Sequence, residues 1–136
     1  MTLSDLVDKN WNSRFKYTAP ALPKYSHQWF WDSCFAAIIN SKINPERAKE
    51  EIKTLLKTQD ENGFIPQNTN WYLSRKSKLT QLPMLAMAVE EVSFSEITSK
   101  VEKYYNWIWE NRMGVDGLIF IVHPWESTDA SPAFGL

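Results

Sequence analysis

The chain has 136 residues, of which 43% are hydrophobic, and its formal net charge at pH 7 is -1. This length predicts one domain, 1–136, and the near-neutral charge without a basic patch argues against nucleic acid as a partner. No apolar run is long enough to span a membrane, and the first ten residues do not resemble a signal peptide. Cys34 is the only cysteine, so no internal disulfide can form, which favours a reducing, cytoplasmic location.

Hydrophobic residues at helical spacing predict five helices in chain order. The expected helices span about 3–15, 29–40, 45–58, 80–91 and 93–112. Capping residues support several of these starts, because a side-chain oxygen can accept the free N–H groups of a first turn. The capping candidates are Thr2 or Ser4, Asn44 before Pro45, and Ser93 with Glu96 three residues later.

The segments between these helices are predicted as turns and loops. Prolines break the connector 16–27, a turn is expected at 60–63, and the stretch 68–78 is polar and loop-like. An apolar, β-branched run follows at 118–122. The fold class expected from this pattern is all-α, with stacked helical hairpins and a site built at one end of them.

The segment 28–35, Gln-Trp-Phe-Trp-Asp-Ser-Cys-Phe, is the first candidate for a functional site. It combines four aromatic side chains with one carboxylate, Asp32, whose burial without a partner would cost several kcal/mol. Aromatic walls around a fixed anion suit a pocket that stacks on a polyhydroxylated ring and accepts its hydroxyl protons. The alternative is an amphipathic helix start in which Asp32 is a capping acid. Cys34 lies on the apolar stripe and is expected to be a buried core thiol.

The segment 123–132 is the second candidate. Glu126 and Asp129 are two carboxylates three residues apart, next to Trp125, and paired carboxylates are what the hydrolysis of an acetal requires. The alternative is a loop in which Asp129 caps a following helix. His27 and His123 do not have the spacing of a metal site, and the glycines form no phosphate-binding loop, so no metal or cofactor is expected.

Three motifs together resemble glycoside hydrolase family 63, whose catalytic domain is an (α/α)6 barrel. They are the segment 28–35, Thr-Gln-Leu-Pro-Met-Leu-Ala at 80–86, and His-Pro-Trp-Glu-Ser-Thr-Asp-Ala-Ser-Pro at 123–132. The nearer relatives by this resemblance are microbial glucosylglycerate and mannosylglycerate hydrolases and related α-glucosidases. The resemblance implies that the chain is the N-terminal part of such a domain, forming part of an incomplete helical toroid.

The resemblance also implies an inverting hydrolase of α-linked glucosides or mannosides, with a small carbohydrate as substrate and no metal in the chemistry. Asp129 matches the expected general acid. The expected substrate-binding residues are Trp31, Asp32, Gln81, Trp125 and Glu126.

The chain departs from the family pattern in the segment that carries Asp129. The family segment usually reads Trp-Glu-Ser-Gly-x-Asp-Asn-Ser-Pro, whereas this chain has one residue fewer between Ser127 and Asp129 and no glycine there. Ala130 stands where asparagine is usual, which removes a side-chain amide. Losing a glycine and a residue is expected to change the backbone path that aims Asp129.

The family's general base lies in the C-terminal half of the domain, about 6.5–9.5 Å from the acid across the sugar in inverting enzymes. Because Leu136 precedes it, residues 1–136 are expected to be inactive alone. Helices without neighbours would expose apolar surface, so we expect self-association or a complementary C-terminal polypeptide as partner. The alternatives are a non-catalytic sugar-binding or structural remnant, a subunit of a split enzyme, and an unrelated helical interaction module.

Overall fold

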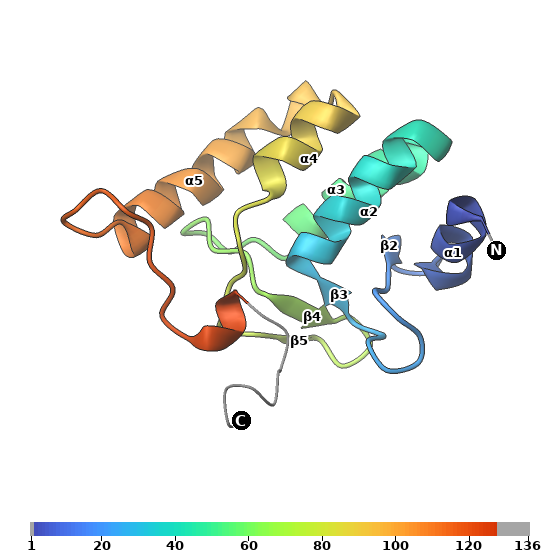
Figure 1. Cartoon of the computed structure of the whole chain (residues 1–136), viewed down its shortest axis with the longest axis horizontal. Coiled ribbons are helices and arrows are strands. Elements are labelled where there is room, and N and C mark those ends of the chain that lie inside the picture. Colours follow the sequence, from blue (N-terminus) through green and yellow to red (C-terminus); the bar gives the residue numbers. More distant parts are fainter. Residues whose placement is uncertain (1, 128–136) are drawn as a thin grey trace.

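The computed structural model describes residues 2–127 and shows helical hairpins together with two small antiparallel sheets (Figure 1). The helices are α1 (Leu3–Asn10), α2 (Phe30–Ile43), α3 (Pro45–Leu56), α4 (Leu85–Val92) and α5 (Thr98–Arg112), with short 3₁₀ turns η1 (Ser95–Ile97) and η2 (Pro124–Glu126). The strands are β1 (Trp11–Asn12), β2 (Tyr17–Thr18), β3 (Gln28–Trp29), β4 (Asn68–Asn70) and β5 (Arg75–Lys76).

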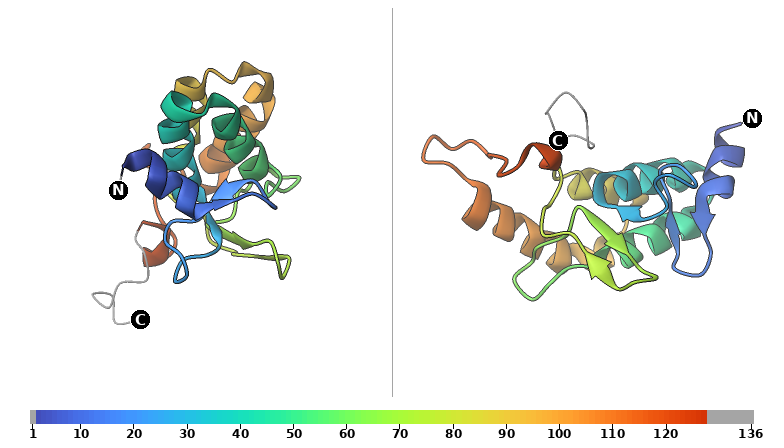
Figure 2. Two further views of the ribbon diagram at one scale, coloured as in Figure 1. Left: turned by 90° about the vertical axis from the view of Figure 1, so that its right-hand side faces the viewer. Right: turned by 90° about the horizontal axis from the view of Figure 1, so that it is seen from below.

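Helix α2 is the central element, because it contacts α1, α3, α4, β2 and β3. The views in Figures 1 and 2 place α1 at one end of the molecule and the loop after α5 at the opposite end. β1 pairs with β2, while β4 lies between β3 and β5 in the second sheet. The first residues of α2 therefore lie where the helices meet the three-stranded sheet.

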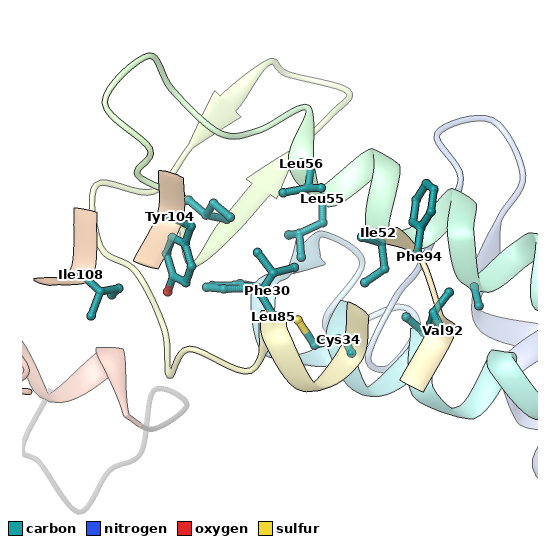
Figure 3. Close-up of a cluster of buried hydrophobic side chains, with 14 residues drawn as sticks. Phe30, Cys34, Ile52, Leu55, Leu56, Leu85, Val92, Phe94, Tyr104 and Ile108 are labelled. Carbon is teal, nitrogen blue, oxygen red and sulfur yellow. The ribbon is translucent and has the colours of Figure 1, made fainter. Parts of the chain in front are cut away.

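The core lies between α2, α3, α4 and α5 (Figure 3). Phe30 of α2 meets Tyr104 of α5 edge to face, with ring centroids 5.1 Å apart. The apolar faces predicted for the third and fifth helices are confirmed, since all their members are buried or pack against this core. They are Ala48, Ile52, Leu55, Leu56, Ile97, Val101, Tyr104, Tyr105 and Ile108. Cys34 is fully buried, as predicted, and burial raises the pKa of its thiol well above its usual value.

The start of α2 is capped by segments that are distant in the sequence. Its N-cap residue is Trp29, whose side chain makes no capping hydrogen bond. Instead the Phe30 N–H donates to the Gln67 carbonyl (2.8 Å), and the Trp31 N–H donates to Oε1 of Gln81 (3.0 Å). A first turn leaves N–H groups without helical partners, so these two contacts stabilise the turn that carries Asp32.

Two predicted caps are confirmed. Thr2 accepts from the Asp5 N–H at the start of α1, and Asp5 accepts from the Thr2 N–H in return. Asn44 accepts from the Arg47 N–H (3.1 Å) at the start of α3. The turn at 60–63 is also confirmed, and Gly63 is required there because a Cβ would lie 2.3 Å from the Lys103 carbonyl oxygen.

The predicted first helix is too long, because α1 ends at Asn10 and the chain then forms the β1–β2 hairpin. Lys16 closes this hairpin with a φ of 62°, and the Asn12 side chain accepts from the Phe15 N–H. The stretch 68–78, predicted as a loop, contains β4 and β5. The fold is therefore mainly helical as expected, and the two small sheets are short additions that the pattern did not predict.

The predicted fourth helix starts too early. Residues 80–84 are not helical. The Thr80 hydroxyl donates to the Ile65 carbonyl, and the Tyr105 hydroxyl donates to the Pro83 carbonyl. In addition, Pro83 disfavours a helical conformation of the residue before it. The capping box at Ser93 is also wrong. Ser93 adopts a left-handed conformation (φ 54°) and ends α4, and α5 begins at Thr98 after the turn η1.

Candidate functional site

Three hollows surround the first turn of α2, and the largest lies against the three-stranded sheet. It has a volume of about 530 Å³, which is in the range of small-molecule sites. The indoles of Trp29 and Trp125 form part of its wall. The other lining residues are His27, Gln67, Asn68, Asn70, Leu73, Arg75, Lys76, Ser77 and Leu79.

The polar groups of this cavity are held by hydrogen bonds. His27 Nε2 pairs with the side-chain amide of Asn70 (2.9 Å), and the side-chain amide of Gln67 donates to the Trp125 carbonyl. The Lys76 ammonium donates to the Thr58 carbonyl (3.0 Å), whereas Arg75 is exposed. Among residues 2–127, none that lines this cavity is acidic. The cavity can therefore stack on a ring, hydrogen-bond hydroxyl groups and attract an anion.

The second hollow, of about 140 Å³, lies between α1 and α2 and contains Asp32. Its walls are mostly apolar and include Leu3, Leu6 and Phe35, which are exposed by 55%, 41% and 48%. Thr18 of β2 also lines it. Asp32 thus faces a different hollow from Trp125.

The third hollow contains Gln81 and Glu126 and, at about 30 Å³, is too small for a sugar ring. The Glu126 side chain is 2% exposed and forms an ion pair with Arg112 (3.0 Å). It also accepts from the Val122 N–H (2.7 Å). Burial raises the pKa of Glu126, but the Val122 N–H and the Arg112 guanidinium outweigh it, so that this pKa is lowered. Glu126 is consequently ionised at neutral pH and cannot donate a proton.

The structure brings five of the predicted site residues to the same turn of α2 but divides them between hollows. Trp31 is joined through its backbone to Gln81, which shares a hollow with Glu126. Trp125 and Asp32 lie in the two other hollows. Asp129, the predicted general acid, is outside the described residues.

Glu51 is a buried carboxylate that sequence reasoning missed. It is fully buried in α3, and its carboxylate accepts from the Thr18 N–H (2.7 Å), the Thr18 hydroxyl (2.8 Å) and the Ser33 hydroxyl (2.6 Å). The signal was present, because Glu51 falls three residues after Ala48 and four before Leu55 on the apolar face. A charged residue on such a face requires partners.

Within residues 2–127, no three His, Cys, Asp or Glu side chains cluster closely enough to hold a metal ion. Over the same residues, no helix is long and apolar enough to cross a membrane.

Comparisons with known proteins place the molecule among the glycoside hydrolases. Residues 25–136 match the model of the mannosylglycerate hydrolase MGH1-like glycoside hydrolase domain, and the chain belongs to this family. A mannosylglycerate hydrolase from Thermus thermophilus is 30% identical over 90% of the chain. A glucosylglycerate hydrolase from Mycolicibacterium hassiacum is 48% identical over 35% of the chain. The resemblance to family 63 is therefore confirmed.

A solved structure gives the same result. The family 63 mannosylglycerate hydrolase from Thermus thermophilus, in complex with Tris and D-glycerate, matches with a TM-score of 0.84 and 29% identity over 96% of the chain. The chain spans only 38% of that protein's length. It likewise spans 38% of the Thermus relative and 10% of the Mycolicibacterium relative in the sequence comparison.

Proposed function

We propose that residues 1–136 form the N-terminal part of an inverting glycoside hydrolase domain that acts on α-linked mannosides or glucosides of glycerate. The observation that carries this proposal is the cavity of about 530 Å³ beside the start of α2. It combines two indoles, several side-chain amides and Arg75, and no acidic residue from the described part of the chain lines it. A sugar joined to an anionic group needs this combination.

The aromatic and amide groups of the cavity would hold the sugar ring, and Arg75 would hold the carboxylate of the glycerate. A related protein of solved structure was obtained in complex with D-glycerate, which supports this class of ligand. Guanidinium groups pair with carboxylates in a planar, two-point geometry, and Arg75 is exposed at the cavity. Lys76 is less suited, because an ammonium is a point charge without the planar fork of a guanidinium, and the hydrogen bond to the Thr58 carbonyl restricts its position.

In this proposal Asp129 is the general acid that protonates the leaving oxygen. Glu126 is unsuitable for that step, since its lowered pKa keeps it ionised. Asp129 follows Glu126 by three residues, and Glu126 is anchored to Arg112. Anchoring this segment beside the cavity would bring Asp129 toward the bound sugar. Asp32 lies in a different hollow and has no contact with the sugar in this proposal.

The general base would come from the remainder of the domain, and two surfaces of the molecule support this view. At one end, the residues 118–122 after α5 are all apolar and each is 47–68% exposed. At the other end, which α1 forms in Figure 2, Leu3 and Leu6 are exposed and line one hollow together with Phe35. Exposed apolar groups of this size mark surfaces that a further polypeptide covers.

Buried donors support the same view. Among residues 2–127, the Gln81 side-chain N–H and the indole N–H groups of Trp29 and Trp125 have no hydrogen-bond partner. An unpaired buried donor costs about 1–3 kcal/mol. All three lie in hollows beside the start of α2, so further groups of the domain, or a ligand, would satisfy them on assembly.

Binding of mannosylglycerate and glucosylglycerate to the chain, measured by calorimetry, tests the cavity. Trp125→Ala should weaken binding about tenfold or more, since stacking and packing are lost. Trp109→Ala is the matched control, because Trp109 is 68% exposed on α5 and does not line the cavity. Equal affinity in both variants would contradict the proposed site.

Hydrolysis distinguishes this proposal from its alternatives. Residues 1–136 alone should bind without releasing glycerate. Release that appears on co-expression with the C-terminal part of a family member, and is lost in Asp129→Asn, would identify the chain as part of a split enzyme. Binding without hydrolysis in any assembly would instead identify a sugar-binding remnant.

A further inference from the structure

A continuous series of hydrogen bonds begins at Glu51 and ends at the three-stranded sheet. The Ser33 hydroxyl donates to Glu51 Oε1 and accepts from the side-chain amide of Gln28 (3.0 Å). Gln28 Oε1 in turn accepts from the indole N–H of Trp71 (2.8 Å). Glu51, Ser33 and Gln28 are all less than 2% exposed, so water does not compete for these bonds.

The two ends of this series lie beside different hollows. Ser33 follows Asp32 in the chain, and Thr18, which also donates to Glu51, lines the Asp32 hollow. Gln28 precedes Trp29 in β3 and is opposite Thr69 of β4, the strand whose other residues line the large cavity. The hydrogen bonds therefore join the walls of the two hollows across the first turn of α2.

We propose that Glu51 is a positioning residue, which through Ser33 and Gln28 couples the Asp32 hollow to the cavity lined by Trp29 and Trp125. It touches neither cavity itself. The part of this inference that concerns sugar binding rests on the proposed function, whereas the coupling between the two walls does not.

The coupling depends on whether the Glu51 carboxyl group is protonated, because protonation changes the number of hydrogen bonds that it can accept. The ionised carboxylate accepts all three donors, two from Thr18 and one from Ser33. A protonated carboxyl carries a donor of its own, so one of these hydroxyl groups must turn away. Ser33 cannot turn toward Gln28, because the amide of Gln28 is already a donor in that contact.

The groups around Glu51 explain the pH at which its protonation changes. Arg47 of α3, Cys34 of α2 and Tyr17 of β2 interact electrostatically with Glu51, and Asp32 of α2 acts on Cys34 in turn. Burial raises the pKa of Glu51 to about 8, against the hydrogen bonds from Ser33 and Thr18 and the Arg47 charge, which lower it. The change is thus expected in a pH range in which the fold can be studied.

Nuclear magnetic resonance of the chain between pH 6 and 9.5 tests the coupling. The Thr18 amide and the Trp71 indole N–H are expected to shift with one common midpoint near the Glu51 pKa of about 8. Ser33→Ala should abolish the shift at Trp71 and leave that at Thr18, because only the path through Ser33 is broken. A Trp71 indole without the common midpoint, or one that keeps it in Ser33→Ala, would overturn the proposal.

Two variants of α3 identify the titrating group. Glu51→Gln should remove both shifts, whereas Glu50→Gln, which changes the same charge at the neighbouring half-exposed position, should keep both. If Glu51→Gln fails to fold, the comparison of wild type with Ser33→Ala still decides the question. Loss of the shifts in Glu50→Gln would assign them to another group and refute the role of Glu51.

Affinity for mannosylglycerate separates this inference from the proposed function. The wild-type affinity is expected to change by up to about tenfold across the same midpoint, which corresponds to one hydrogen bond to a charged group. In Ser33→Ala the affinity should not change with pH across this midpoint. No binding at any pH would refute the proposed function while the resonances decide the coupling. Binding with one pH profile in both proteins would refute the positioning role.

Discussion

Two buried carboxylates lie in regions of opposite character. Glu51 is enclosed between α2, α3 and β2, and the pKa of Glu51 is raised to about 8 because burial dominates. Glu126 is almost as buried, but it is paired with Arg112, and its pKa is lowered. The surroundings differ as well, since Glu51 is fully buried between these elements, whereas Glu126 shares a hollow with the exposed residues Ile119, Phe120 and Ile121.

The difference shows what each region requires for stability. In the described part of the chain, three hydrogen bonds and no ion pair hold Glu51, so its ionised form is a buried charge without a paired cation, and burial keeps its proton bound up to a pH of about 8. Glu126 depends on a cation, and the loss of that cation would leave a buried charge. Elements of the described chain enclose Glu51, whereas Glu126 is held by one ion pair beside the exposed apolar residues 118–122.

Arg112→Met should have the largest effect. Removing one partner of a buried ion pair costs about 3–5 kcal/mol, because the other charge is left without compensation. Arg112 also lies over the ring of Trp107, at 4.9 Å, which adds to the loss. Urea unfolding at pH 7 measures the free energy of unfolding.

Lys103→Met on the exposed face of the same helix is the control for this substitution. It removes one cation from α5 at an exposed site and should change the free energy of unfolding by less than about 0.5 kcal/mol. Equal losses in the two variants would show that the ion pair of Glu126 is not what holds this edge.

The next largest effect should be the pH dependence of the free energy of unfolding that Glu51 causes. Its folded pKa lies above the value of 4.5 for an unperturbed glutamate, so the folded state binds one proton more between pH 4.5 and 8. This contribution is fully present below pH 4.5 and is lost as pH rises to about 8, with a slope of about 1.4 kcal/mol per pH unit. Unfolding curves across this range measure it.

Glu126 should act in the opposite direction. Because its folded pKa is lowered, its contribution is present above pH 4.5 and is lost as pH falls through the folded value. Glu51→Gln should therefore flatten the decline between pH 5 and 8 and leave the acid limb unchanged. A decline that persists in Glu51→Gln would contradict the raised pKa of this residue.

Local sequence patterns predicted the parts of the fold that depend on neighbouring residues. The buried faces of α3 and α5, the Asn44 cap and the turn at 60–63 follow from periodicity and capping chemistry. The family could also be predicted, because each of its three motifs is a continuous stretch of sequence. These features need no knowledge of distant contacts.

Distant contacts decided what the sequence could not predict. Thr80 and Gln81 read as the start of a helix, but their side chains bind Ile65 and Trp31, which are far away in the chain. The short strands have too few residues to give an alternating pattern. For the same reason, the separation of Asp32 from Trp125 into two hollows was not visible in their spacing.

Gln81→Ala should have a smaller effect on stability than Arg112→Met. It removes the acceptor for the Trp31 N–H in the first turn of α2, at a cost of about 1–2 kcal/mol. Leu82→Ala is the control, because Leu82 is 41% exposed. If thermal unfolding shows no difference between the two variants, the cap from Gln81 does not stabilise α2.

Phe120→Ser should change the stability least and tests the character of the open edge. Phe120 is 47% exposed, so its removal should alter the free energy of unfolding by less than about 0.5 kcal/mol. Sedimentation should show less self-association than in wild type, since a large apolar group is lost from the uncovered surface. A loss of more than about 2 kcal/mol would instead make Phe120 part of this chain's own core. Unchanged association would assign the contact surface to the opposite end, where Leu3, Leu6 and Phe35 are exposed.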